Sequence, residues 1–213
     1  HGRKLYTGGY HEILVWDPES GALLDRIPNN GQRSYGLALS PDGKMLAAAT
    51  GDPGRAGEVR VFHAQSGRVL ATPFRGDDTL LAVDFSPDGR VLAFGGVDGK
   101  LRLFQAETWT EGFAVSSHSD WLTALSWSRD GDQIATASRD KTAKVYEANT
   151  GKRVSTFSGH SEAVRGIAFH SNGKEVLSAG DHGHLFVWGS ENGKKIADRA
   201  KFDNPVLRFM AGP

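Results

Sequence analysis

The stretch Ser40-Pro41-Asp42-Gly43, "SPDG", recurs unchanged at 86–89 and in altered form as "SRDG" at 128–131 and "HSNG" at 170–173. The glycines that end these four stretches are 46, 42 and 42 residues apart. A second marker has the same spacing, because an aromatic residue closes a short alternating run at Trp16, Phe62, Phe104, Tyr146 and Trp188. Two independent markers with one period indicate a tandem repeat of about 42 residues.

Each period contains four short runs with the character of β-strands. In residues 121–157 the runs are "WLTALSW", "QIATAS", "TAKVY" and "KRVSTF", and the gaps between them carry Gly, Asp, Asn or Ser. Proline presets φ at the second position of a turn and glycine suits the last, so "SPDG" joins two strands tightly. No stretch shows sustained helical spacing with caps. Four strands in about 42 residues, repeated in tandem, predict the blades of a β-propeller.

The sequence therefore predicts an all-β chain that forms a single propeller of five four-stranded blades. The expected blades are 2–27 plus 205–211, 33–74, 78–116, 121–157 and 163–199. Residues 2–27 supply three strands only, and a last strand at 205–211 would complete the first blade. Read across the two ends, Gly212-Pro213 and His1-Gly2 form a variant of the repeated turn, which favours ring closure with the termini within roughly 10 Å.

Composition narrows the function classes. Lys plus Arg and Asp plus Glu both number 25, so no net charge favours nucleic acid or an anionic membrane surface. The chain has no cysteine, which excludes disulfides and thiolate chemistry, and no apolar run approaches the ~20 residues of a membrane span. The compartment is left open by these features.

The stretch "SGHSEAVRGIAF … VLSAGDHGHLFVW" and the pair "WD" at 16–17 resemble WD40 repeats over the whole chain. Two further stretches, "GYHEILVWDPESG" and "TGDPGRAGEVRVF", resemble WD40 arrays of large bacterial proteins that also carry a c-type haem domain, although the chain has no Cys-x-x-Cys-His site. The resemblance implies a propeller fold and says little about function, because this fold hosts many unrelated roles.

The resemblance also implies a buried hydrogen-bond chain of histidine, hydroxyl, aspartate and tryptophan in each blade. Blade four supplies His118, Thr136 and Asp140, with Tyr146 in the tryptophan position. Blade five supplies His160, Ser178 and Trp188, with His182 in the aspartate position, whereas blade three keeps Asp98 but has Phe94 and Phe104 at the hydroxyl and tryptophan positions.

Three chemical roles are alternatives to this structural role. A hydrolase triad is disfavoured because the set recurs with the repeat and no nucleophile elbow accompanies it. A metal site at "DHGH", 181–184, has two histidines on one face and no evident third ligand. The glycine-rich "TGDPGRAG" at 50–57 lacks the Gly-Lys-Ser/Thr of a phosphate loop and is interpreted as a surface loop. We therefore expect no catalytic residue, metal or cofactor.

Partner-binding residues are expected in the loops on one face of the propeller. The expected residues are Arg33, Trp121, Arg139 and Asp181 at repeat-equivalent positions, together with Asp52 and Arg55 in the four-residue insertion of blade two. Trp and Arg are enriched at interface hot spots. A structural role is the alternative for Trp121 and Arg139, with Trp121 packed over the channel mouth and Arg139 stacked on it. For the insertion, the alternative is neutral drift of a loop that tolerates extra residues.

The sequence thus favours a non-enzymatic scaffold, or a module of a larger protein, that binds a protein, a peptide or other domains of the same parent chain. An accessory or substrate-gating domain of an enzyme, with a ligand in the central channel, is the main alternative. Nucleic-acid binding would need a basic stripe with aromatics, which the balanced charge does not suggest.

Overall fold

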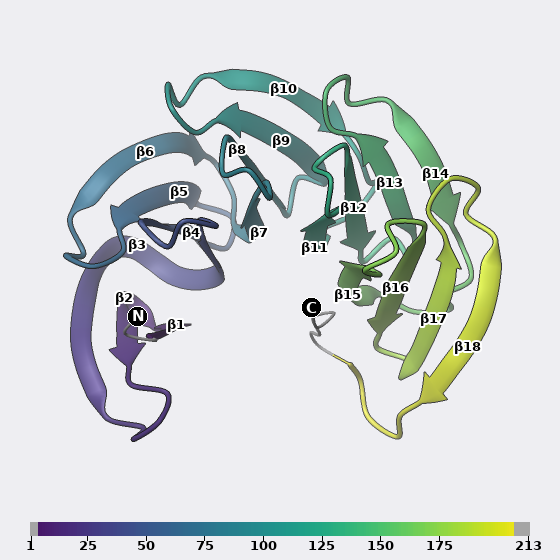
Figure 1. Ribbon diagram of the computed structural model, residues 1–213, viewed down its shortest axis with the longest axis horizontal. Coiled ribbons are helices and arrows are strands. Elements are labelled where there is room, and N and C mark those ends of the chain that lie inside the picture. Colours follow the sequence, from purple (N-terminus) through teal and green to yellow (C-terminus); the bar gives the residue numbers. More distant parts are fainter. Residues whose placement is uncertain (1–3, 207–213) are drawn as a thin grey trace.

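The computed structural model describes residues 4–206, and at 29–32 their backbone only. This part of the chain contains eighteen strands and no helix. The strands form antiparallel sheets that follow one another around an arc (Figure 1). The all-β propeller class expected from the repeat is confirmed.

The first sheet has six strands in chain order, β1 (Leu5–Gly8), β2 (Tyr10–Trp16), β3 (Leu23–Leu39), β4 (Met45–Asp52), β5 (Ala56–His63) and β6 (Val69–Gly76). It combines two blades, because β3 runs unbroken from one to the next. The first part of β3 pairs with β2 through Leu23–Pro28, and its later part pairs with β4 through Arg33–Leu39. The connection between 27 and 33 is thus extended strand. Below, blade one is β1, β2 and the first part of β3, and blade two is the rest of this sheet.

The other three blades are separate four-stranded sheets. Blade three contains β7 (Leu80–Phe85), β8 (Val91–Gly96), β9 (Lys100–Gln105) and β10 (Glu111–Ser116). Blade four contains β11 (Leu122–Trp127), β12 (Gln133–Ser138), β13 (Ala143–Glu147) and β14 (Arg153–Phe157). Blade five contains β15 (Val164–Phe169), β16 (Glu175–Gly180), β17 (His184–Gly189) and β18 (Lys195–Lys201).

The repeated turn joins the first and second strands of blades two to five. Its last glycine has a positive φ in all four copies, 71° at Gly43, 73° at Gly89, 80° at Gly131 and 69° at Gly173. This backbone conformation strains residues with a Cβ, which explains why glycine recurs there. In three copies the serine hydroxyl donates to the aspartate two residues later, for example from Ser40 Oγ to Asp42 Oδ1 at 2.7 Å.

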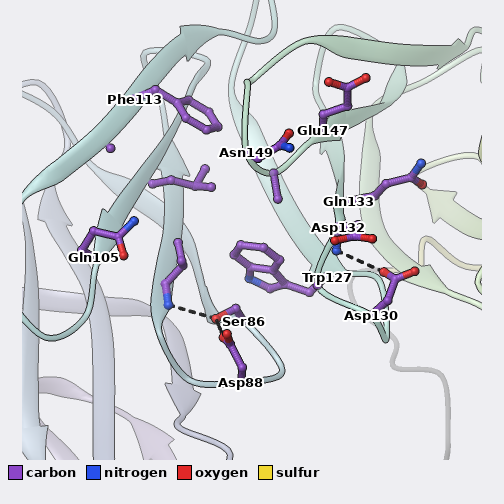
Figure 2. Close-up of a pocket in the computed structure, with 15 residues that line it drawn as sticks. Ser86, Asp88, Gln105, Phe113, Trp127, Asp130, Asp132, Gln133, Glu147 and Asn149 are labelled. Carbon is purple, nitrogen blue, oxygen red and sulfur yellow. Dashed lines mark hydrogen bonds between the residues drawn. The ribbon is translucent and has the colours of Figure 1, made fainter.

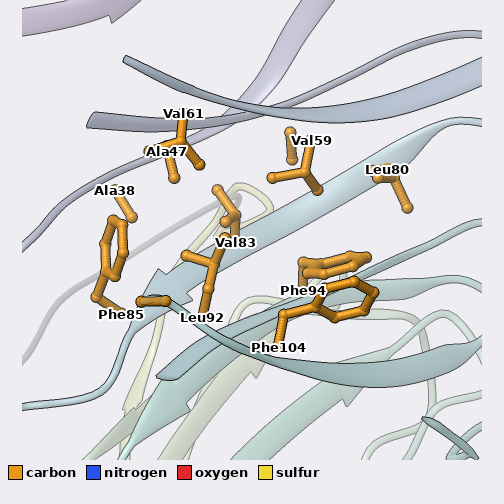
Figure 3. Close-up of a cluster of buried hydrophobic side chains, with 12 residues drawn as sticks. Ala38, Ala47, Val59, Val61, Leu80, Val83, Phe85, Leu92, Phe94 and Phe104 are labelled. Atoms are coloured by element: carbon orange, nitrogen blue, oxygen red, sulfur yellow. The ribbon is translucent and has the colours of Figure 1, made fainter. Parts of the chain in front are cut away.

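A cluster of buried side chains lies between each pair of neighbouring blades. Figure 3 shows the cluster between blades two and three, where Val59 and Val61 of β5 face Phe85, Phe94 and Phe104 of blade three. Phe94 and Phe104 pack with ring centroids 5.2 Å apart. Because each sheet covers the next, the core continues around the arc, and removing one large side chain from it costs about 3–5 kcal/mol.

The expected closure of the ring falls mainly outside the described residues. Within them β1 pairs with β2 alone, and Pro205 and Val206 are not in a strand. The Val206 N–H donates to the carbonyl of Gly180 at 3.1 Å, so the chain after β18 returns to the inner part of blade five. Residues 207–211, which the proposed last strand requires, lie outside the described range, and closure remains a prediction.

Candidate functional site

The alternation of strands defines two faces of the molecule. The entry face carries the loops that lead into the first strand of each blade and the turns between second and third strands. The turn face carries the turns between first and second strands and between third and fourth strands. The hydrogen-bond chains and the expected partner-binding residues all belong to the entry face.

Blade four contains a hydrogen-bond chain that begins in its entry loop. His118 Nδ1 lies 2.9 Å from Asp140 Oδ2, and His118 Nε2 lies 2.9 Å from the hydroxyl of Thr136. Burial alone would raise the pKa of Asp140, but hydrogen bonds from His118 and Thr142 outweigh it and hold the pKa well below its usual range. The carboxylate is therefore ionised and accepts from the imidazole. This chain ties the entry loop to strand β12 and the turn that follows it.

Tyr146 of blade four is buried, but its hydroxyl does not reach Thr136. It donates instead to the carbonyl of Ser117 at 2.9 Å, beside His118. Burial raises the pKa of Tyr146 to about 12, so the phenol stays protonated and acts as the donor. The residue in the tryptophan position thus holds the entry loop through its backbone.

Blade five contains a four-membered chain with a second histidine. His160 Nε2 lies 2.7 Å from Ser178 Oγ, which also accepts from Trp188 Nε1 at 3.0 Å. His160 Nδ1 lies 3.0 Å from Nε2 of His182. Burial, with His182 and His184 beside it, lowers the pKa of His160 to about 3, so this histidine is neutral at ordinary pH.

Blade three lacks the histidine and shows how the repeat compensates. Asp98 is bound by the guanidinium of Arg102, whose Nη2 lies 2.5 Å from Asp98 Oδ2. Arg102 is buried and lies over the ring of Phe74 at 4.6 Å. Phe94 and Phe104 complete an aromatic cluster where the other blades carry polar groups. An ion pair on a phenyl ring has replaced the imidazole chain.

The entry face of blade four combines an aromatic ring, a cation and a carboxylate. The guanidinium carbon of Arg139 lies 4.3 Å from the centre of the Trp121 ring, and Arg139 Nε donates to Asp120 Oδ2 at 2.9 Å. Asp120 also accepts from the Trp121 N–H at 2.8 Å. Burial would raise the pKa of Asp120, but the hydrogen bonds from Arg139 and from the Trp121 N–H together outweigh it and lower the pKa. Trp121 is half-buried, and the Arg139 side chain is 44% exposed.

Asp181 in blade five occupies the position that Arg139 has in blade four. It is bound in a two-point ion pair by Arg165 of β15, with Nε and Nη2 at 3.0 and 2.9 Å from its two oxygens. Both side chains are about one-third exposed. Adjacent blades therefore carry opposite charges at this position, and each charge is already paired.

The remaining expected residues lie on blade two. Arg33 is exposed at the start of the later part of β3, with its guanidinium carbon 5.9 Å from the ring centre of Tyr35. Asp52 and Arg55 flank the tip of the β4–β5 hairpin, where Arg55 Nη1 lies 3.7 Å from Asp52 Oδ2. The inserted residues lengthen this hairpin, and its tip is bonded from Gly54 N–H to Asp78 in the entry loop of blade three at 3.0 Å.

The structure thus brings Trp121 and Arg139 together and leaves Arg33, Asp52 and Arg55 on other blades. Asp120 and Arg165, the ion-pair partners, were missed in the sequence. Asp120 directly precedes Trp121 but has acidic counterparts in Asp78 and Glu162, so it does not stand out from the repeat. Arg165 has uncharged counterparts in Leu81 and Thr123, and this departure from the repeat was the available signal.

Sites of other classes are not evident in the described part of the chain. No group of three or more His, Asp or Glu side chains among residues 4–206 could hold a metal ion. No helix in that range is long and apolar enough to cross a membrane.

Tandem four-stranded blades with polar chains on one face define this protein as a propeller of repeated modules. A family model described as "WD domain, G-beta repeat" matches residues 67–105, 110–147 and 151–189. These segments make up more than half of the chain, and the chain belongs to this WD40 family. The family resemblance found in the sequence is therefore confirmed.

Individual relatives match over about half of this chain. Periodic tryptophan protein 2 of Arabidopsis thaliana is 29% identical over 93 residues, 44% of this chain and 10% of its own length. Protein groucho of Drosophila melanogaster is 31% identical over 105 residues, covering 47% and 14%. Target of rapamycin complex subunit wat1 of Schizosaccharomyces pombe is 32% identical over 107 residues, covering 49% and 32%. The match spans at most about a third of each of these relatives.

Proposed function

We propose that this chain is a non-enzymatic protein-interaction module that binds a partner protein on the entry face of blade four. The observation that carries the proposal is the arrangement of Trp121, Arg139 and Asp120. It presents an aromatic ring and a guanidinium, both partly exposed, on a rigid sheet. These two side-chain types dominate the energetics of protein interfaces.

Preorganisation supports this reading. Asp120 holds Arg139 against the Trp121 ring, so binding need not restrict two long side chains that are already ordered. Ordering one flexible side chain at an interface costs about 0.5–1.5 kcal/mol, so a prearranged pair retains more of its contact energy. The Arg165–Asp181 pair in the next blade extends the same polar face.

The relatives favour interaction over catalysis. One of them is by its name a subunit of a complex, and WD repeats are the shared element. A partner on this face, or another domain of the same parent chain, fits that pattern. The alternative of an enzyme's accessory domain would call for convergent acids or histidines on the innermost strands. Strands β7, β11 and β15 carry two charged residues, Asp84 and Arg165, in different blades.

The test is a comparison of two double variants in capture experiments. Immobilised wild-type protein, Trp121→Ala/Arg139→Ala and the control Arg68→Ala/Leu70→Ala are exposed to lysate of the source organism, and retained proteins are quantified by mass spectrometry. The control removes an exposed arginine and an exposed apolar residue from blade two. We expect one set of proteins to be retained by wild type and control and reduced at least tenfold by the Trp121/Arg139 variant.

Thermal unfolding separates binding from stability. The melting temperature of the Trp121/Arg139 variant should fall by less than about 2 °C, because 1 kcal/mol shifts Tm by about 2–4 °C at this size. Unchanged retention with a large fall in Tm would show that the pair is structural, and the proposal would be wrong.

A further inference from the structure

A concave site lies on the turn face, between blades three and four. Its volume is about 820 Å³, within the range of about 300–1,000 Å³ that is usual for ligand pockets. It is formed by the repeated turns of the two blades, by β9 and β10, and by the turn after β13. Because strands β11 and β12 separate the two ends of blade four, this pocket is distinct from the Trp121 site.

The pocket joins aromatic surface to negative charge. In Figure 2 the Trp127 ring lies below Phe113, with the carboxylates of Asp130 and Asp132 to its right and that of Glu147 at the upper right of the view. Asp88 is a fourth carboxylate at its edge. Among the residues that line it there is no lysine, arginine or histidine. The lining therefore carries four acidic groups. Asp88 has Arg90 Nε at 3.9 Å, and the other three are in no ion pair within the described residues.

Comparison among the repeats shows that this charge is peculiar to blade four. The residue directly after the turn glycine is Lys44 in blade two, Arg90 in blade three and Lys174 in blade five, but Asp132 in blade four. In blades two and three this cation lies near the aspartate of its own turn, at 3.4 Å for Lys44 and 3.9 Å for Arg90. Blade four has a second acid at this position, beside Asp130, and its turn carries a cation instead at Arg129, where blades two and three have proline.

The end of the third strand is also acidic in blade four and not in blades three and five. The residue that pairs with the first residue of the second strand is Gln105 in blade three and Gly189 in blade five, but Glu147 in blade four. Trp127 likewise replaces Phe85 and Phe169. The turns do not require Asp132 or Glu147, because the neighbouring blades form the same turns without them, whereas Trp127 also belongs to the buried cluster between blades three and four. Like charges placed together are unfavourable unless a cation joins them.

The carboxylates have capacity for such a cation. Asp130 uses Oδ1 to accept from the Ser128 hydroxyl at 2.6 Å and from the Asp132 N–H at 3.1 Å. The hydrogen bond from Ser128 lowers the pKa of Asp130, so the group is ionised at neutral pH. Within the described residues, Asp130 Oδ2 and both carboxylate oxygens of Asp132 receive no hydrogen bond.

We propose that this pocket binds an arginine side chain presented by a segment of a partner protein. A guanidinium is the cation that best fits both parts of the lining. It is planar and weakly hydrated, it stacks on aromatic rings such as Phe113, and it pairs with two carboxylate oxygens at once. A lysine ammonium would gain the charge contact but less of the aromatic one.

The probe is the peptide acetyl-Gly-Arg-Gly-Arg-Gly-amide, titrated into the whole chain labelled with ¹⁵N. The indole N–H signal of Trp127 is assigned with Trp127→Phe, which installs the residue type of blades three and five at this position. We expect the peptide to shift the Trp127 signal and to leave the Trp121 signal in place. Peptides with citrulline or lysine in place of arginine should bind at least tenfold and threefold more weakly.

Two variants isolate the pocket. Asp132→Lys installs the residue type of blades two and five, so it should fold normally, and it should weaken arginine-peptide binding at least tenfold. Glu19→Lys makes the same change of charge in an exposed turn of blade one and should leave binding within twofold. The Trp121→Ala/Arg139→Ala variant should also bind the peptide normally, so this result is independent of the entry-face proposal.

Four outcomes would overturn the proposal. They are equal binding of the citrulline peptide, equal binding of the lysine peptide, equal weakening by Glu19→Lys and Asp132→Lys, and no shift of the Trp127 signal at millimolar peptide.

Discussion

Blades four and five have a hydrogen-bond chain at equivalent positions, but the hydrogen bonds of the two chains are donated in opposite directions. In blade four the ionised Asp140 accepts from His118 Nδ1–H, so the neutral ring has a bare Nε2 that accepts from the Thr136 hydroxyl. In blade five His182 Nδ1 accepts from the backbone N–H of His184 at 3.1 Å. The proton of His182 is then on Nε2.

The consequence passes along the chain of blade five. His182 Nε2–H donates to His160 Nδ1, and His160 Nε2–H donates to Ser178, which also accepts from Trp188. One substitution, aspartate to histidine, has reversed the donors and acceptors while the distances stay between 2.7 and 3.0 Å. Equivalent positions in a repeat thus preserve geometry without preserving charge. Blade four depends on a buried anion, and blade five depends on two neutral imidazoles.

The largest effect is expected from removing the anion of blade four. Asp140→Ala deprives the His118 ring, the Thr142 hydroxyl and the Ser119 N–H of their acceptor. The His118 ring is buried and the Thr142 hydroxyl is partly buried, whereas the exposed Ser119 N–H can bond to water. Unsatisfied buried groups cost about 1–3 kcal/mol, so the free energy of unfolding should fall by about 3 kcal/mol in a denaturant titration. The control Glu19→Ala, in an exposed turn, should change it by less than about 0.5 kcal/mol. A variant as stable as the parent would mean that the chain does not hold blade four together.

The second prediction concerns acid. Because burial lowers the pKa of His160 to about 3, and burial also lowers that of His182, the unfolded chain binds protons more readily than the folded one below pH 6.5. The stability from neutral His160 is complete above pH 6.5 and is lost as the pH falls towards about 3. At about 1.4 kcal/mol per unit, acidification from pH 6.5 to 5 should lower the free energy of unfolding by about 2 kcal/mol.

Replacing His182 by aspartate tests whether the second histidine of blade five is the cause of this acid sensitivity. His182→Asp gives blade five the anion of blade four, so His160 acquires an acceptor that favours its charged form and its pKa rises. The loss of stability between pH 6.5 and 5 should then shrink, as measured by unfolding at a series of pH values. A part of it should persist, because burial lowers the pKa of His118 even beside Asp140. Identical pH dependence of variant and parent would show that the second histidine is not the source of acid sensitivity.

The sequence predicts what repeats and misses what does not. The period and turn chemistry identify the strands, because the "SPDG" turn needs glycine at a positive φ such as that of Gly43. The His118, Thr136 and Asp140 set follows from the resemblance to WD40 repeats. The continuity of β3 does not follow from the sequence, since Pro28 suggests a break that the strand pairing on both sides overrides.

The acidic pocket was not predicted either. Asp132 is conspicuous only after the pocket shows that its charge adds to those of Asp130 and Glu147. The proton direction in blade five depends on a backbone N–H of His184, which no residue pattern encodes.

The smallest effect is expected at Tyr146, where blades four and five differ in the aromatic residue. Tyr146→Phe removes the hydrogen bond from the phenol to the Ser117 carbonyl. That carbonyl also accepts from Lys144 Nζ at 2.6 Å, so it keeps a partner and no acceptor is left unsatisfied. Phenylalanine fills the equivalent position in blade three as Phe104, so the ring itself should be tolerated. The free energy of unfolding should therefore fall by about 0.5–1 kcal/mol.

Lys144→Met provides the matching control, because it removes the other donor. The double variant should lose clearly more stability than the sum of the two single losses, because only in the double variant does the Ser117 carbonyl have neither donor. Strict additivity would show that the two donors do not share this acceptor in solution.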